Sequence, residues 1–229
     1  MKLFGRCKFK RSFRFSTENS VNTSKKQLKS DLKRYVKLAK DFGASDAKII
    51  RASEVVDERV RMKCLVPLCH RYGNSGFCPP YAPEPKVVRE AIKKYDYAIL
   101  VKHDVIPKED FIAPGTGKSF IEKIGKHHGK IMEIVSKIET VAFNDGYYLA
   151  MGFAAGSCRT ALCKGATCSL IQNGECRFPL IARPSMEAVG IDVYKLVRKV
   201  GWDIYPIGPK DISPEKIPCA ISVGIVFIQ

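Results

Sequence analysis

The chain has 229 residues, of which 45% are apolar, and it carries a formal net charge of +16. That length suits one large α/β domain or two small ones, with a core that can be stable without a metal. No apolar run approaches the roughly 18 to 20 residues that span a bilayer, which excludes a transmembrane segment and predicts a soluble protein.

Residues 1–23 predict a basic, flexible N-terminal arm in front of a cysteine-rich α/β domain over residues 24–229. Residues 1–40 hold 13 Lys and Arg against Glu18 and Asp31, so most of the excess charge lies at this end. Such an arm can contact nucleic acid or steer the protein toward an acidic partner. No helix-turn-helix or stacking motif accompanies it, which favours a solvated tail.

The first half predicts a helix that starts at a capping box, because Ser24 is followed by Gln27 and then by apolar residues at helical spacing. Alternation of apolar and polar residues before Cys64 predicts a strand that delivers this cysteine at its C-terminal end. The expected elements are a helix over 24–43, strands over 46–52 and 59–63, a helix from Pro85 and a strand over 97–102.

The second half predicts a long amphipathic helix over residues 119–143, where isoleucine and valine recur in phase. The expected strand over 147–153 leads into a loop that contains four cysteines. A helix over 185–200 and strands over 202–205 and 220–228 complete the chain.

Both halves share one order: helix, strand, cysteine loop, helix, strand. We therefore expect an α/β fold with a single sheet and helices, with two pseudo-repeats over about 25–102 and 119–206. The cysteine loops then lie at the C-terminal ends of strands, where α/β folds place their sites. A chance match of coarse patterns is the alternative.

Nine cysteines without a preceding apolar signal peptide argue against a disulfide framework and for a reducing, cytoplasmic compartment. Organellar targeting by the basic residues 1–23 is the alternative. Seven of the cysteines form two groups. We call Cys64, Cys69 and Cys78 the upstream nest, and Cys158, Cys163, Cys168 and Cys176 the downstream nest.

The spacings within both nests favour an iron–sulfur cluster. Structural zinc commonly uses pairs of cysteines two residues apart, and neither nest contains such a pair. Wider spacings suit a [4Fe-4S] cluster, because its irons lie several Å apart and each takes one thiolate. A proline soon after the last cysteine is also common in ferredoxins, and prolines follow both Cys78 and Cys176 here. Zinc and redox-active dithiols remain alternatives.

The two nests differ in the number of cysteines. Four thiolates can bind all four irons of a [4Fe-4S] cubane, which suits electron transfer or a structural role. Three leave one iron for His70, for Cys7 or Cys219, or for an exogenous ligand, and an open iron can act as a Lewis acid. The sequence thus predicts one cluster in which cysteine binds every iron, and a second cluster in which one iron has no cysteine ligand from its nest.

Basic residues interleave both nests and can stabilise thiolates. They are Lys63, Arg71, Arg159, Lys164, Arg177 and Arg183. Glu187 is a candidate acid or base near the downstream nest. A helix cap at Ser185 is the simpler explanation of this motif. His127 and His128 diverge by about 100° on a helix, so they cannot chelate together and are expected on an exposed polar face.

The chain resembles an uncharacterised prokaryotic family of predicted metal-binding proteins. The residues that carry the resemblance are Arg61-Met62-Lys63-Cys64, Cys69, Tyr72-Gly73, Cys78-Pro79-Pro80, Cys176-Arg177-Phe178-Pro179, Ala182-Arg183-Pro184-Ser185-Met186-Glu187-Ala188 and Gly190-Ile191-Asp192-Val193. It covers about residues 25–229 and leaves the N-terminal arm outside. It implies metal binding and leaves the reaction open.

These observations predict an iron–sulfur protein with two [4Fe-4S] clusters, held by the two nests, in electron transfer or cluster-assisted redox chemistry. A redox protein is then the expected partner. One alternative is a zinc-stabilised module that binds nucleic acid or a protein. Another is an accessory protein that stores or transfers metal.

Overall fold

A four-stranded antiparallel sheet forms the centre of the molecule, in the strand order β1-β2-β4-β3. The structure is a computed structural model and describes residues 24–52, 55–112, 118–207 and 213–229. The strands are β1 Asp46–Arg51, β2 Tyr97–Asp104, β3 Met151–Phe153 and β4 Ile221–Phe227. The predicted α/β class with a single sheet is confirmed.

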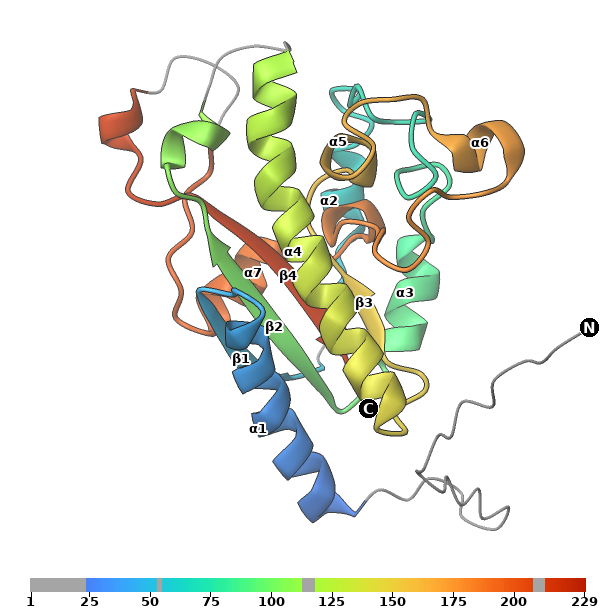
Figure 1. Ribbon diagram of the computed structural model, residues 1–229, viewed down its shortest axis with the longest axis vertical. Helices are drawn as coiled ribbons and strands as arrows, with labels where there is room; N and C mark the ends of the chain where they lie inside the picture. Colours follow the sequence, from blue (N-terminus) through green and yellow to red (C-terminus); the bar gives the residue numbers. More distant parts are fainter. Residues whose placement is uncertain (1–23, 53–54, 113–117, 208–212) are drawn as a thin grey trace, which may run out of the picture.

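Helices α1 (Lys25–Asp41) and α4 (Lys118–Asn144) pack on one face of the sheet (Figure 1). The predicted cap is present, since Ser24 Oγ accepts a hydrogen bond from Gln27 N at 3.1 Å. Tyr35 is fully buried between the two helices and the sheet. No helix in the described part of the chain combines the length and apolarity needed to cross a bilayer.

Helices α3 (Pro85–Ile92) and α7 (Val193–Lys199) cover the opposite face of the sheet. Their buried side chains pack against alternate residues of β2 and β4, as expected for a strand with two buried faces. Short elements complete the fold: α5 Cys158–Ala161, α6 Ser169–Asn173, η1 Lys108–Phe111, η2 Glu187–Val189 and η3 Pro214–Lys216.

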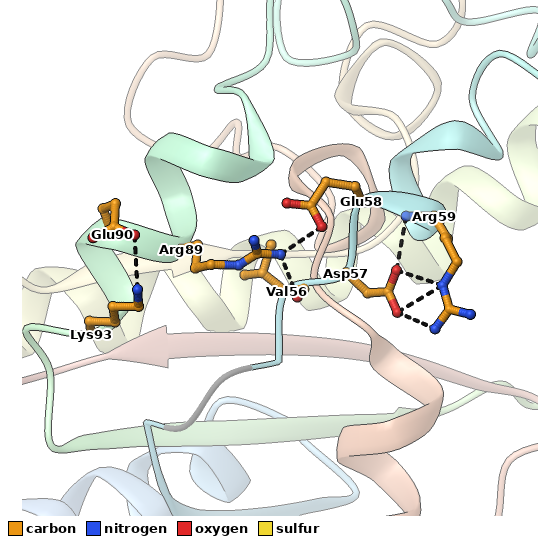
Figure 2. A network of polar contacts seen from close by, with 7 residues as sticks. All are labelled: Val56, Asp57, Glu58, Arg59, Arg89, Glu90 and Lys93. Atoms are coloured by element: carbon orange, nitrogen blue, oxygen red, sulfur yellow. Dashed lines mark hydrogen bonds and ion pairs between the residues drawn. The ribbon is translucent and has the colours of Figure 1, made fainter.

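The predicted strand over 59–63 is wrong, because this segment forms helix α2 (Glu58–Met62). Asp57 caps the helix and accepts a hydrogen bond from Arg59 N at 2.9 Å. Arg89 of α3 donates to Val56 O at 2.9 Å and to Glu58 at 2.7 Å, which ties the start of α2 to α3 (Figure 2). A local cap therefore outweighs a short alternating pattern that has no partner strand.

Two other expectations differ from the structure. The helix predicted over 185–200 is split by Gly190, whose φ of +83° ends η2 before α7 begins. Residues 202–205 form no strand, and Trp202 instead packs against the sheet and donates to Asp46 Oδ2 at 2.9 Å. The pseudo-repeat is not confirmed, because the downstream nest follows strand β3 whereas Cys64 follows a helix.

Candidate metal centre

The downstream nest lies in a loop that follows β3 and closes around a small cavity. Cys158 begins α5, and Cys168 caps α6. Lys164 and Gly165, both with positive φ, reverse the chain between these helices. All four cysteines of this nest line the cavity, together with the apolar side chains of Phe77, Leu162, Phe178 and Ala182. The loop thus gathers four soft ligands behind an apolar wall.

The environments of Cys158 and Cys168 differ electrostatically. Burial raises the pKa of the Cys158 thiol to about 12, although a hydrogen bond from Ser75 opposes this shift. Burial acts on Cys168 in the same direction, but the backbone N–H groups of Gly76, Ile171 and Leu170 hold its pKa below the usual value. The donors at the start of α6 therefore favour a thiolate at Cys168.

The upstream nest lies between α2 and α3, where tight turns bring its cysteines together. Cys69 N donates to Cys64 O at 3.0 Å, and Cys78 N donates to Ser75 O at 2.9 Å. The three cysteines line a second cavity, of about 650 Å³. Burial raises the pKa of Cys64 and of Cys78, and the neighbouring cysteines add to this effect. A cation among these thiols would relieve that penalty.

The two cysteine segments interlock beside α2 and α5 (Figure 1). Ser75 Oγ lies 3.3 Å from Cys158 Sγ, and Cys78 Sγ donates to Ser157 Oγ at 3.6 Å. Gly76 N donates to Cys168 Sγ at 3.4 Å. Residues about 80 positions apart in the sequence therefore form one site with two cavities.

The other candidate ligands separate into two groups. His70 lines the larger cavity together with the upstream nest. Cys219 borders neither cavity in the described residues, and Cys7 lies outside them. Every described cysteine is free of disulfide bonds.

The predicted cationic environment is only partly present. Arg159 and Arg177 donate to backbone carbonyls of the downstream loop and so hold its shape. Arg183 is paired with Glu139 at 2.8 Å, which neutralises its charge. Arg71 lines the larger cavity, and its charge faces Cys69 and Cys78.

The expected exposed face of His127 and His128 is wrong. His127 is 2% exposed and its Nε2 lies 2.9 Å from Asp110 Oδ2. His128 lines the larger cavity, and burial lowers its pKa to about 4. Residues of η1 and β2 cover this side of α4, which no pattern within the helix reveals.

Ser185 has the predicted capping role, but Glu187, which was predicted near the downstream nest, lies in the cavity of the upstream nest and does not border the cavity of the downstream nest. Ser185 Oγ accepts a hydrogen bond from Ala188 N at 3.1 Å, which caps the turn of η2. Glu187 lines the larger cavity, and desolvation by the surrounding protein raises its pKa. The raised pKa favours the protonated form of this carboxyl group more than in free solution.

The spread of the donors bears on the kind of metal. Within the described residues, no three His, Cys, Asp or Glu side chains come close enough together to hold one metal ion. A zinc ion needs donors within about 2.3 Å of one point, whereas a cubane takes one thiolate at each of several separated irons. The described side chains are therefore not arranged as a preformed site for a single metal ion.

The fold and the paired nests define an α/β protein with a candidate metal centre beside its sheet. The sequence matches the family described as predicted metal-binding protein (DUF2284) over residues 48–226, and the chain belongs to this family. The expected resemblance is therefore confirmed, and the match contains both nests. Searches of curated proteins and of solved structures found no match.

Several residues of the site escaped the sequence analysis. Ser75 and Ser157 contact cysteines of the opposite segment, and Ile124 and Ser222 line the larger cavity from α4 and β4. Ser157 directly precedes Cys158, which was a usable signal. The others become part of the site only through long-range packing.

Proposed function

We propose that this protein is an iron–sulfur protein with two clusters of different roles. Cys158, Cys163, Cys168 and Cys176 would hold one [4Fe-4S] cluster completely, and the upstream nest would hold a second that has one open iron. The observation that carries the proposal is the contrast between the cavities: four cysteines line a small apolar one, whereas three line a large one.

The chain's own residues support this division of roles. Phe77 and Phe178 place apolar surface beside the downstream nest, which suits a cluster that only exchanges electrons. The larger cavity leaves room for another molecule beside the upstream nest. When bound, such clusters supply one-electron chemistry and, at an open iron, a Lewis acid.

The contacts between the nests suit the passage of electrons from one site to the other. Cys78 donates to Ser157, which directly precedes Cys158, so a short chain of bonded atoms links the two cavities. A small redox protein would be the electron partner. The free cysteines fit a reducing compartment such as the cytoplasm.

The test is an analysis of iron, zinc and acid-labile sulfide in anaerobically purified protein. About eight irons with eight sulfides per chain support both clusters, and about four irons leave one nest without its own cluster. Stoichiometric zinc without sulfide overturns the proposal in favour of a zinc-stabilised binding module. Rapid loss of metal to a chelator favours storage or transfer.

A further inference from the structure

The larger cavity extends from the upstream nest to the start of β4. Its wall includes Arg71, Ile121, Ile124, His128, Ser222 and Val223. A volume of about 650 Å³ is within the range of sites that hold a small organic molecule. Most of the named side chains from α4 and β4 are aliphatic, so the molecule that fits here has an apolar body.

Unpaired polar atoms concentrate in the wall of this cavity. In the described residues, the buried side-chain atoms without a hydrogen-bond partner are Arg71 Nε, His103 Nδ1, His128 Nδ1 and Ser222 Oγ. Arg71, His128 and Ser222 all line the cavity, and Ser222 is only 2% exposed. Leaving such atoms without a partner is unfavourable, so a ligand with polar atoms that reaches them would bind favourably here.

Arg71 is the cation of this wall, and no described carboxylate pairs with it. Two other shielded arginines do have such partners: Arg61 lies 2.8 Å from Glu84, and Arg183 lies 2.8 Å from Glu139. A guanidinium presents a planar fork of donors that matches a carboxylate. The missing partner of Arg71 is therefore expected to be an anion that enters the cavity.

We propose that the cavity binds a medium-chain organic carboxylate. Its carboxylate pairs with Arg71 beside the upstream nest, and its apolar chain lies against Ile121, Ile124 and Val223. The identification of this molecule as a substrate rests on the proposed function, because a metal at the upstream nest must supply the chemistry. The binding step rests on the cavity alone.

A competing role for Arg71 is to balance the thiolates of Cys69 and Cys78, which its charge also faces. Among the described residues that line the cavity, the acidic one is Glu187. Its charge raises the pKa of Cys64, and it forms no ion pair with Arg71. A role confined to the thiolates predicts that replacement of Arg71 changes metal content but not carboxylate binding. The two roles can therefore be separated by experiment.

The experiment is calorimetric titration of the full-length, anaerobically purified protein with octanoate, with octanol and acetate as matched ligands. Octanol lacks the carboxylate, and acetate lacks the apolar chain. The variants are R71Q, R198Q as a control of equal charge change at an exposed arginine outside the cavity, and I124W, which places a bulky ring in the apolar wall of the cavity. Circular dichroism and iron and zinc analysis accompany each preparation.

We expect octanoate to bind at least tenfold more tightly than octanol or acetate, because a charge-assisted hydrogen bond contributes about 1.5–3 kcal/mol. R71Q should reduce octanoate affinity to that of octanol, I124W should weaken binding of both, and R198Q should bind as the wild type does. Octanoate binding that R71Q leaves unchanged, or no binding to folded, metal-loaded protein, overturns this inference alone. Arg71-dependent binding to protein without iron overturns only the proposed function.

Discussion

Ser75 Oγ lies 3.3 Å from Cys158 Sγ, so a fully buried serine of the upstream segment contacts a cysteine of the downstream nest. The pair of Cys78 and Ser157 repeats this relationship in the opposite direction. Each nest therefore depends on the other segment for the environment of one of its sulfurs. A substitution in one segment should therefore change the environment of cysteines at both cavities.

Replacement of Ser75 by alanine should lower the free energy of unfolding of the metal-free protein by about 1 kcal/mol, the usual contribution of a buried hydrogen bond. Urea denaturation measures the change. Ser213→Ala, at an exposed serine, should stay within about 0.5 kcal/mol of the wild type. Equal losses in both variants would show that the contact with Cys158 contributes nothing.

The metal-free protein should lose stability as pH rises from about 9 to 12. The Cys158 thiol has an ordinary pKa of 9.0 and a folded-state pKa of about 12, so the unfolded chain loses its proton first. In this window the unfolded state binds fewer protons than the folded state, and unfolding becomes more favourable as pH rises. Denaturation midpoints across this range measure the effect.

Cys158→Ala is the control for this pH dependence. Other thiols and phenols titrate in the same range, and they do so in both proteins. The wild-type curve should therefore fall more steeply than that of the variant. Parallel curves would contradict a strongly raised pKa at Cys158.

Gly156→Ala should destabilise the protein by more than the matched Gly146→Ala variant. Both glycines have positive φ, of +65° and +100°, so both substitutions strain the backbone. A Cβ at Gly156 would lie 2.0 Å from Nδ1 of His128, whereas one at Gly146 meets no atom within 4 Å. The difference in unfolding free energy, expected at about 1–3 kcal/mol, isolates the clash. Similar values would show that His128 moves aside freely.

Cys69→Ser should reduce the iron content of anaerobically purified protein from about eight to about four atoms per chain, because one cubane is lost. Cys168→Ser should remove the other cluster and leave a different absorption and electron paramagnetic resonance spectrum. Cys219→Ser is the control, since Cys219 borders neither described cavity. Unchanged iron and spectrum in Cys69→Ser would rule out an upstream cluster.

Asp110→Ala should cost about 1–3 kcal/mol of stability, because it leaves Nε2 of the buried His127 without its partner. Asp110→Asn keeps an oxygen that can accept this hydrogen bond and should cost less. Thermal or urea unfolding of the two variants measures the difference. An identical cost would indicate that the charge of Asp110, and not its hydrogen bond, is what matters.

Local patterns were sufficient to predict several elements and the two nests. The helix after Ser24 and the strand over 97–102 follow from capping and apolar spacing, which act between near neighbours. The helix at Glu58 was not predicted, because the alternation of apolar and polar residues before Cys64 indicated a strand, although Asp57 is a residue type that commonly caps a helix. The cysteine spacing indicated a metal centre, and the family match agrees with metal binding.

Only the tertiary structure brought Ser75 to Cys158 and Ile124 to the upstream cavity, because these contacts join segments that lie far apart in the sequence. It also buried His127, which helical periodicity had assigned to an exposed face, since η1 supplies Asp110 as its partner. Spacing along a chain reports neighbours within a few residues. The enclosure of a cavity depends on how sheet, helices and loops pack, and so the contrast in size between the two cavities emerged only in three dimensions.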